Sequence, residues 1–317
     1  MGTFIARRLL QGLAVLILVT VFVFLVMRLL PSDPVTIYYS QFENGGDQAT
    51  IEFYRHAYGL DRSLPYQYLI WIKGIAHGDF GQSFAQNQTV ASILAKRLPV
   101  TLELGFTALI IAAILGVLFG VICAFKHNKW IDSVLSVLAN LGFTAPSFWV
   151  GIVLIFVVGY KLHLLPMQSY VSPFDHFWSG VTHAILPVLC LALAPIGILT
   201  RQTRSAMLEV IQQDYMRTAR SKGLAQGVIM IRHGLKNALI PVVTILGLQI
   251  RNIVGGAVLV EMVFSLPGLG SMMVSGVLNR DYMVVQAGIL VVAVTVLFIN
   301  LLVDISYGWL DPRIRYS

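Results

Sequence analysis

The chain has 317 residues, of which 57% are hydrophobic, and its 22 Lys and Arg outnumber its 15 Asp and Glu to give a formal net charge of +7. Charged residues make up only 12% of the chain, about half of the roughly 25% that a soluble domain carries. This composition excludes a soluble globular protein and an intrinsically disordered chain, and it predicts a protein that crosses a membrane several times.

Six runs with few or no charges are long enough to cross a bilayer as helices, which takes about 20 residues. The first is too long for the apolar part of a signal peptide and lacks a small-residue cleavage site. The fifth is interrupted by Arg251, and we interpret its two parts as one helix. The sequence therefore predicts an all-α polytopic membrane protein with six transmembrane helices, at residues 9–27, 104–125, 133–160, 176–200, 237–260 and 282–303.

The distribution of basic residues predicts the orientation of these spans, because cytoplasmic segments carry an excess of Lys and Arg. With the N-terminus inside, the cytoplasmic segments hold thirteen basic residues and the two short outer loops hold two. Both termini are therefore expected in the cytoplasm. The net positive charge suggests contact with anionic membrane lipid or a protein partner, and nothing in the sequence resembles a nucleic-acid-binding module.

The segment 31–98 lies outside in this orientation. Its apolar periodicity predicts short helices at 50–58 and 66–75, and Gly78 to Gly81 predict a turn.

The cytoplasmic segment 201–237 is longer than a connection between two spans requires. Leu208, Ile211, Tyr215 and Ala219 recur at spacings of three and four, which predicts one face of a single helix. Gly223 would end that helix, and a second short helix at 228–233 would lead into the fifth span. Two interpretations remain open: a helix lying on the lipid headgroups, or a docking helix for a cytoplasmic partner.

Several kinds of chemistry have no residues to support them. A phosphate-binding loop needs Gly-Lys before Ser or Thr, and the dipeptide Gly-Lys does not occur in the chain. No metalloprotease or serine-hydrolase motif occurs, and the two cysteines, Cys123 and Cys190, lie in apolar runs. We therefore expect no enzymatic activity, no bound cofactor and no metal in this chain.

The run Asp214-Tyr215-Met216-Arg217-Thr218-Ala219-Arg220-Ser221-Lys222-Gly223-Leu224 resembles the "EAA" coupling region of ABC importer permeases, in the form found in the dipeptide, oligopeptide and nickel group. The general motif opens with Glu-Ala-Ala, whereas this chain has Arg217-Thr218-Ala219 and keeps only Ala219 and Gly223. The resemblance to the "B" permease subunit extends over the whole chain, with further matches at residues 60–65, 78–83, 145–151, 232–241, 255–261, 267–270, 280–282, 300–304 and 310–316.

The resemblance implies a type I ABC importer permease fold in a bacterial inner membrane. It implies an N-terminal tail and first span at 1–30, an extracytoplasmic segment at 31–98, and a permease core at 99–317 with a coupling region at 201–237. The implied partners are a homologous second permease, two cytoplasmic ABC ATPases that bind the ATP and Mg²⁺, and an extracytoplasmic substrate-binding protein. The coupling residues would be Asp214, Tyr215, Arg217, Thr218, Ala219, Arg220, Lys222 and Gly223.

Charged residues within spans are costly and usually face a cavity or a partner. We expect Arg251 and Glu261 as candidates for the translocation path, with Arg251 favouring an anionic group such as a peptide carboxylate. The alternative is that Arg251 forms a structural ion pair.

Three functions remain to be distinguished. The resemblance favours an importer of di- and oligopeptides. The same machinery could import a nickel or other metal chelate, glutathione or an opine. A stand-alone secondary transporter is the third, and no repeat between the two halves of the chain supports it.

Overall fold

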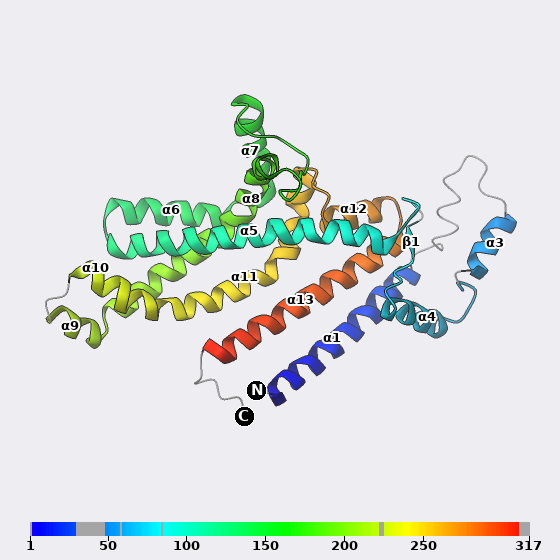
Figure 1. The fold of residues 1–317 in the computed structure, drawn as a ribbon, viewed down its shortest axis with the longest axis horizontal. Coiled ribbons are helices and arrows are strands. Elements are labelled where there is room, and N and C mark those ends of the chain that lie inside the picture. Colours follow the sequence, from blue (N-terminus) through cyan, green and yellow to red (C-terminus); the bar gives the residue numbers. More distant parts are fainter. Residues whose placement is uncertain (1, 30–47, 58, 84, 222–224, 311–317) are drawn as a thin grey trace. The chain divides into compact units, whose positions relative to one another are not determined.

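The structure is a computed structural model, and it describes residues 2–29, 48–57, 59–83, 85–221 and 225–310 (Figure 1). Helices account for most of this part of the chain, together with one two-stranded antiparallel sheet. The polypeptide forms two compact units, one from Met1–Val100 with Gly268–Ser317 and the other from Thr101–Pro267. The first unit therefore joins the two ends of the sequence.

Two long helices run side by side in the first unit, α1 (Gly2–Leu29) and α13 (Tyr282–Leu310) (Figure 1). Gly12 on α1 lies opposite Leu297 on α13, and Arg8 Nε lies 3.2 Å from Asp304 Oδ2. The beginning of α1 thus meets the end of α13, as expected for two spans that cross in opposite directions.

The predicted outer helices of the first unit are present as α3 (Gln48–Ala57) and α4 (Leu64–Ala76). Pro65 stands in the first turn of α4, where its missing N–H costs no hydrogen bond. Helix α4 packs on α1: the hydroxyls of Thr20 and Tyr68 are 2.9 Å apart, and the ring of Phe24 contacts those of Tyr68 and Trp71.

A short hairpin follows the predicted turn, with β1 (Gln82–Ser83) paired to β2 (Gln88–Thr89). Asp281, which precedes α13, holds this hairpin in place. Its carboxylate accepts hydrogen bonds from the Ser83 hydroxyl at 2.5 Å and from the Val284 backbone N–H at 3.3 Å. An apolar cluster lies nearby, formed by the start of α5, by α12 (Leu269–Leu278) and by the start of α13.

The second unit is built around α8 (Phe177–Ile211), which packs against the later part of α5 (Val90–Phe125), α6 (Trp130–Thr144) and α11 (Lys236–Val263) (Figure 1). Small residues allow this close packing. A Cβ added at Gly120 of α5 would lie 2.5 Å from Thr203 Cβ, and one at Gly116 would lie 2.6 Å from Leu199 Cβ. Helices α5 and α8 therefore approach each other closely at these two glycines.

The third predicted span, 133–160, is not one straight helix. It is divided into α6 and a second segment formed by α7 (Ser147–Leu154) and the π-helix η1 (Ile155–Lys161), bent by 105°. The break falls at Ala145 and Pro146, both extended in backbone conformation, because a residue that precedes proline is disfavoured in the helical region. Hydropathy predicted the apolar run correctly but gave no signal for the bend.

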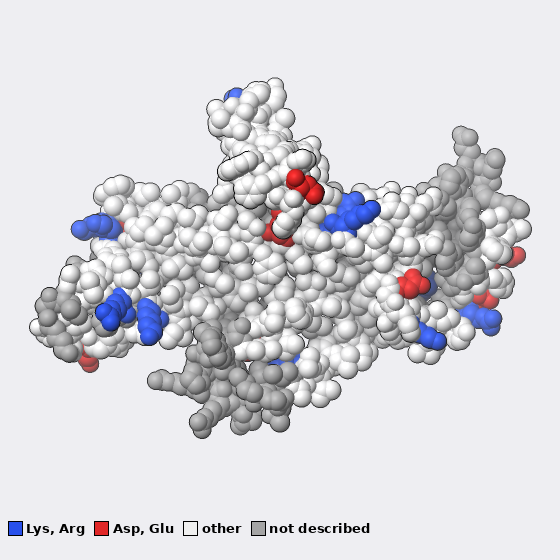
Figure 2. Space-filling view, viewed as in Figure 1, with Lys and Arg blue, Asp and Glu red and all other residues white. Residues whose placement is uncertain are grey.

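Four single helices of the described chain are long and apolar enough to span a membrane, at Ala6–Leu29, Val90–Phe125, Phe177–Ile211 and Tyr282–Ile305, and the bent pair can supply a fifth span. The Arg251-containing run forms one continuous helix, α11, as predicted, and its described part Lys236–Ile250 is apolar but shorter than a span. A total of six spans therefore stays a prediction. Figure 2 shows Lys and Arg gathered near α10 and the start of α11, with uncharged side chains over much of α6.

Candidate functional site: a coupling helix and its anchor

The coupling region does not form the single helix that its spacing predicted. Helix α8 continues past residue 200 to Ile211, the chain turns at Gln212 and Gln213, and α9 covers Asp214–Ser221. The interruption lets α9 pack against η2, and it places Met216 and Ala219 in an apolar cluster with residues from the end of α8. The second predicted helix is present as α10 (Gln226–Val228) and the π-helix η2 (Ile229–Leu235), which continue directly into α11.

Helix α9 is anchored on its inner side by an apolar cluster of unit 2. Met216 is fully buried and Ala219 is 9% exposed. They pack with residues from the ends of the long helices and from η2: Ala124, Ala206, Met207, Ile229, Met230 and Ala238. Burying a Met side chain contributes about 1.5–3 kcal/mol, so this cluster couples the position of α9 to the ends of α5, α8 and α11.

The outer side of α9 is polar and open. The side chains of Asp214 and Arg217 are 98% and 74% exposed, and they form an ion pair of 3.6 Å. Thr218 is also exposed, and its hydroxyl donates to the Asp214 carbonyl. Tyr215, expected on the apolar face, is 43% exposed, and its hydroxyl accepts a hydrogen bond from Asn237 Nδ2 at 3.0 Å. Met216 occupies the buried position instead.

Three of the expected coupling residues are described only in part or not at all. Arg220 lies in α9, but its side chain is outside the described residues, as are Lys222 and Gly223 altogether. Their roles stay predictions.

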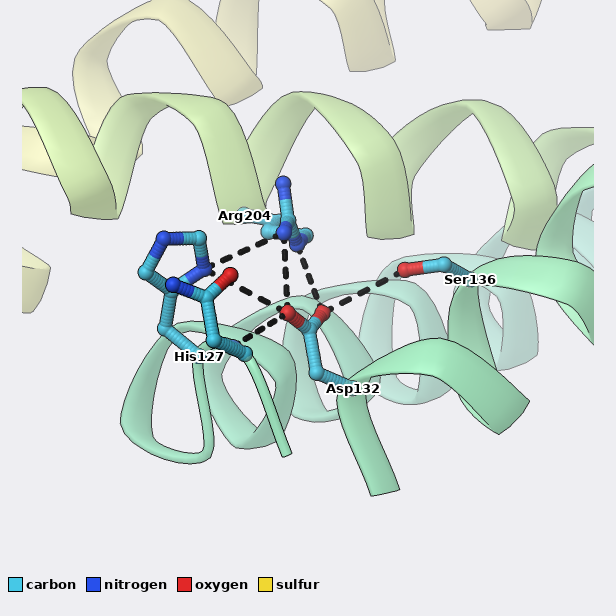
Figure 3. Close-up of polar contacts among 5 residues, drawn as sticks. His127, Asp132, Ser136 and Arg204 are labelled. Atoms are coloured by element: carbon cyan, nitrogen blue, oxygen red, sulfur yellow. Dashed lines mark hydrogen bonds and ion pairs between the residues drawn. The ribbon is translucent and has the colours of Figure 1, made fainter. Parts of the chain in front are cut away.

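A second anchor joins α8 to the α5–α6 connection (Figure 3). Arg204 of α8 holds the Asp132 carboxylate with two charged hydrogen bonds, Nε to Oδ1 at 2.7 Å and Nη2 to Oδ2 at 2.8 Å. Asp132 is 4% exposed, and it also accepts hydrogen bonds from the Asn128 backbone N–H at 3.1 Å and the Ser136 hydroxyl at 3.3 Å. His127 Nδ1 lies 3.3 Å from the same carboxylate and 3.2 Å from Arg204. The forked geometry fixes the orientation of α6 relative to α8 as well as holding them together.

No sequence pattern predicted this anchor. A signal was present, since Asp132 is the one acidic residue between Glu103 and Asp175, and a lone carboxylate beside Lys126 and Lys129 indicates a structural partner. Its partner lies 72 residues away, and no local pattern identifies it.

The roles of Arg251 and Glu261 in the translocation path stay predictions, and the structure describes the surroundings of only one of the two side chains. Glu261 is 1% exposed and accepts a hydrogen bond from the Thr101 hydroxyl at 2.6 Å, so its carboxylate joins α11 to α5 within unit 2. Arg251 lies within α11, and its side chain is outside the described residues.

A further tie connects the long loop before α8 to this end of the unit. The Tyr170 hydroxyl donates to Glu103 Oε2 at 2.7 Å, and the Ser169 N–H donates to the Phe264 carbonyl at 3.2 Å. Burial and the neighbouring Glu103 carboxylate raise the pKa of Tyr170 above its ordinary value, so the phenol stays protonated and keeps its role as donor.

Comparison with known proteins identifies the wider family. The model for the "Binding-protein-dependent transport system inner membrane component" matches residues 116–316, and the model for the N-terminal part of such membrane components matches residues 1–105. The dipeptide transport system permease protein DppB of Alkalihalophilus pseudofirmus is 38% identical, with 98% of each chain covered. The oligopeptide transport system permease protein AppB of Bacillus subtilis is 38% identical, with 100% of each chain covered.

A solved structure agrees at the level of the fold. The crystal structure of an amino acid ABC transporter with histidines matches with a TM-score of 0.52 and 17% sequence identity, covering 69% of this chain and 94% of that chain. At that identity the match shows a common fold. The two family models and the relatives matched over their full length agree with this fold and with the long apolar helices. The chain therefore belongs to the family of inner membrane components of binding-protein-dependent transport systems, in which it is a multi-pass permease subunit and not a catalytic one.

Proposed function

We propose that this chain is a permease subunit of an ATP-driven importer of short peptides. The names of its full-length relatives, a dipeptide and an oligopeptide permease, support the substrate class. They do not favour a metal chelate, glutathione or an opine. Two cytoplasmic ATPases, a homologous second permease and an extracytoplasmic binding protein complete the assembly, and ATP and Mg²⁺ bind to the ATPases.

The main support for this mechanism is that one side of α9 is buried and the other is exposed. Its inner side is fixed by Met216 and Ala219 in the apolar cluster, whereas Asp214, Arg217 and Thr218 are exposed and can meet a protein partner. A push on the exposed side therefore moves the ends of α5, α8 and α11 with α9 as a rigid body. Rigid-body shifts of packed helices are a common means of switching a protein between two states.

The orientation follows from the charge distribution. With α9 in the cytoplasm, both termini also lie there, and the basic residues follow the rule for cytoplasmic segments. The same placement puts α3, α4 and the β1–β2 hairpin outside, where a binding protein would dock.

The test is ATP-driven uptake of a radiolabelled dipeptide by proteoliposomes that contain the full complex, with and without vanadate. Uptake should require the ATPases and stop with vanadate. An Ala219→Phe variant should lose uptake while the complex still assembles, because a large ring cannot fit in the cluster without moving α9. Ser133→Phe, an equally bulky change at an exposed position, should leave uptake intact. Uptake driven by an ion gradient in the absence of the ATPases would refute the proposal.

A further inference from the structure

A cavity of about 300 Å³ lies in unit 2 among α5, α6, α7, α8 and α11. This volume is at the lower end of the range of about 300–1,000 Å³ found for small-molecule sites. Most of its lining is apolar, and the residues that matter for its chemistry are Phe143, Ser147, Leu191, Ala194, Pro195 and Gln249.

The cavity lies where two helices depart from regular geometry. Phe143 and Ser147 flank the 105° break between α6 and α7. Pro195 lies inside α8 and has no N–H, so the Leu191 carbonyl, four residues earlier, loses its regular helical donor. Both Leu191 and Pro195 line the cavity.

These departures provide hydrogen-bonding groups in an otherwise apolar wall. The Leu191 carbonyl can accept, the Ser147 hydroxyl can accept or donate, and the Gln249 amide can do both. Irregular backbone at membrane depth is tolerated where it is buried in protein or lines a cavity, and interrupted helices of this kind form substrate sites in other transporters. A peptide backbone, which alternates N–H donors and carbonyl acceptors, complements such a set.

A cation lies outside the cavity, because Arg201 lines a second pocket of about 200 Å³ together with Asn140 and Thr200. Arg201 follows Ala194 by seven residues on α8, so it lies on the same helix face two turns further on. Its guanidinium lies over the ring of cavity-lining Phe143, 5.5 Å from the centroid. The structure records no carboxylate partner for Arg201 among the described residues, which distinguishes it from Arg204.

We propose that this cavity is a transient binding site for the transported peptide within the permease. The cavity holds one apolar side chain and its adjoining backbone amides, and Arg201 receives the peptide carboxylate. The inference rests on the proposed function, and it adds a selective step after delivery by the binding protein. Substrate choice would then depend in part on this chain.

The test uses variants whose larger side chains fill the cavity, and it compares the uptake of two dipeptides. Complexes that carry Ala194→Phe or the smaller Ala194→Val are reconstituted in proteoliposomes, and uptake of Gly-Gly and of Phe-Phe is measured at saturating binding protein. The variants should lower the Phe-Phe to Gly-Gly uptake ratio by about tenfold or more, since a hydrophobic pocket discriminates by that order for even small changes in side-chain size. Leu189→Phe, on an exposed position of the same helix outside the cavity, should leave the ratio unchanged.

The cation is tested separately. Arg201→Gln should lower uptake of both dipeptides several-fold, Arg201→Lys should restore part of it, and the exposed Lys126→Gln should have no effect. An unchanged probe ratio in the Ala194 variants, or full uptake in Arg201→Gln, would overturn the assignment.

Assembly and ATPase activity distinguish the possible failures. If both Ala194 variants block pairing with the second permease, the cavity is a contact between subunits and the proposal is wrong. If the Ala194 variants keep vanadate-sensitive uptake and an unchanged Phe-Phe to Gly-Gly ratio, the proposed binding site is wrong but the importer function is not.

Discussion

The anchor between Asp132 and Arg204 makes an asymmetric prediction about stability. Asp132 is almost fully buried, whereas the side chain of Arg204 is 30% exposed. Arg204→Ala leaves a buried carboxylate with only neutral donors and His127 around it, and breaking a buried ion pair in this way costs about 3–5 kcal/mol. Asp132→Ala leaves a guanidinium that can reach water, so its cost is smaller, about 1–3 kcal/mol, the scale of a lost hydrogen bond to a charged group.

The measurement is a double-mutant cycle on the purified complex in detergent, with thermal or denaturant unfolding of the permease as the readout. The double variant Asp132→Ala/Arg204→Ala should be less destabilised than the sum of the single changes, with a coupling energy of about 1–3 kcal/mol. Arg204→Lys should recover only part of the stability, because an ammonium cannot form the two-point contact. Lys126→Ala, which removes an exposed cation from the same connection, is the matched control.

A functional consequence accompanies the loss of stability. Helix α6 should no longer follow α8, so ATP hydrolysis should continue in the Arg204→Ala complex while uptake per ATP falls. If the single changes prove additive, with a coupling energy near zero, the anchor does not hold α6 to α8 and the argument fails.

Three other predictions follow from single contacts. Met216→Ala should lower the free energy of unfolding by about 2–5 kcal/mol, because it leaves a cavity in the apolar cluster, and it should reduce uptake per ATP. Thr218→Ala on the same helix should leave stability unchanged, and equal unfolding free energies for the two variants would contradict the role of the cluster. Gly120→Ala should destabilise the permease by about 1–3 kcal/mol through overpacking against Thr203, in contrast to Gly227→Ala, where an added Cβ meets no atom within 4 Å; similar melting temperatures would argue against the close α5–α8 contact. Asp281→Ala should release the β1–β2 hairpin and speed its limited proteolysis, since it removes the bond to Ser83 and the contact with the Val284 N–H at the start of α13; an unchanged cleavage rate would show that the hairpin is held by other contacts.

Hydropathy predicted the parts of this fold that depend on single segments. The helices α1, α5, α8 and α13 contain the runs expected to cross the membrane, because the cost of exposing polar groups to lipid leaves few alternatives for a long apolar run. The short helices α3 and α4 were also predicted closely, since their amphipathic period and the proline and glycine near their ends are local signals.

The features that the sequence did not predict are contacts between segments. The turn at Gln212 and Gln213 carries neither Gly nor Pro, and α9 separates from α8 because Met216 and Ala219 find cover in a cluster drawn from four other elements. The Asp132–Arg204 anchor and the cavity behind Pro195 likewise depend on which helices become neighbours. No periodicity in one segment contains that information.

The pairing of the first and last helices has a consequence for biosynthesis. Helix α1 leaves the ribosome first, yet Arg8 meets Asp304 only after nearly the whole chain has been made. At roughly 5–20 residues per second, the leading helix must wait about 15–60 s in the membrane for its neighbour, whereas the middle unit can close earlier. A nascent chain that ends before α13 should therefore leave the side of α1 that packs on α13 uncovered, where quality-control proteases can recognise it.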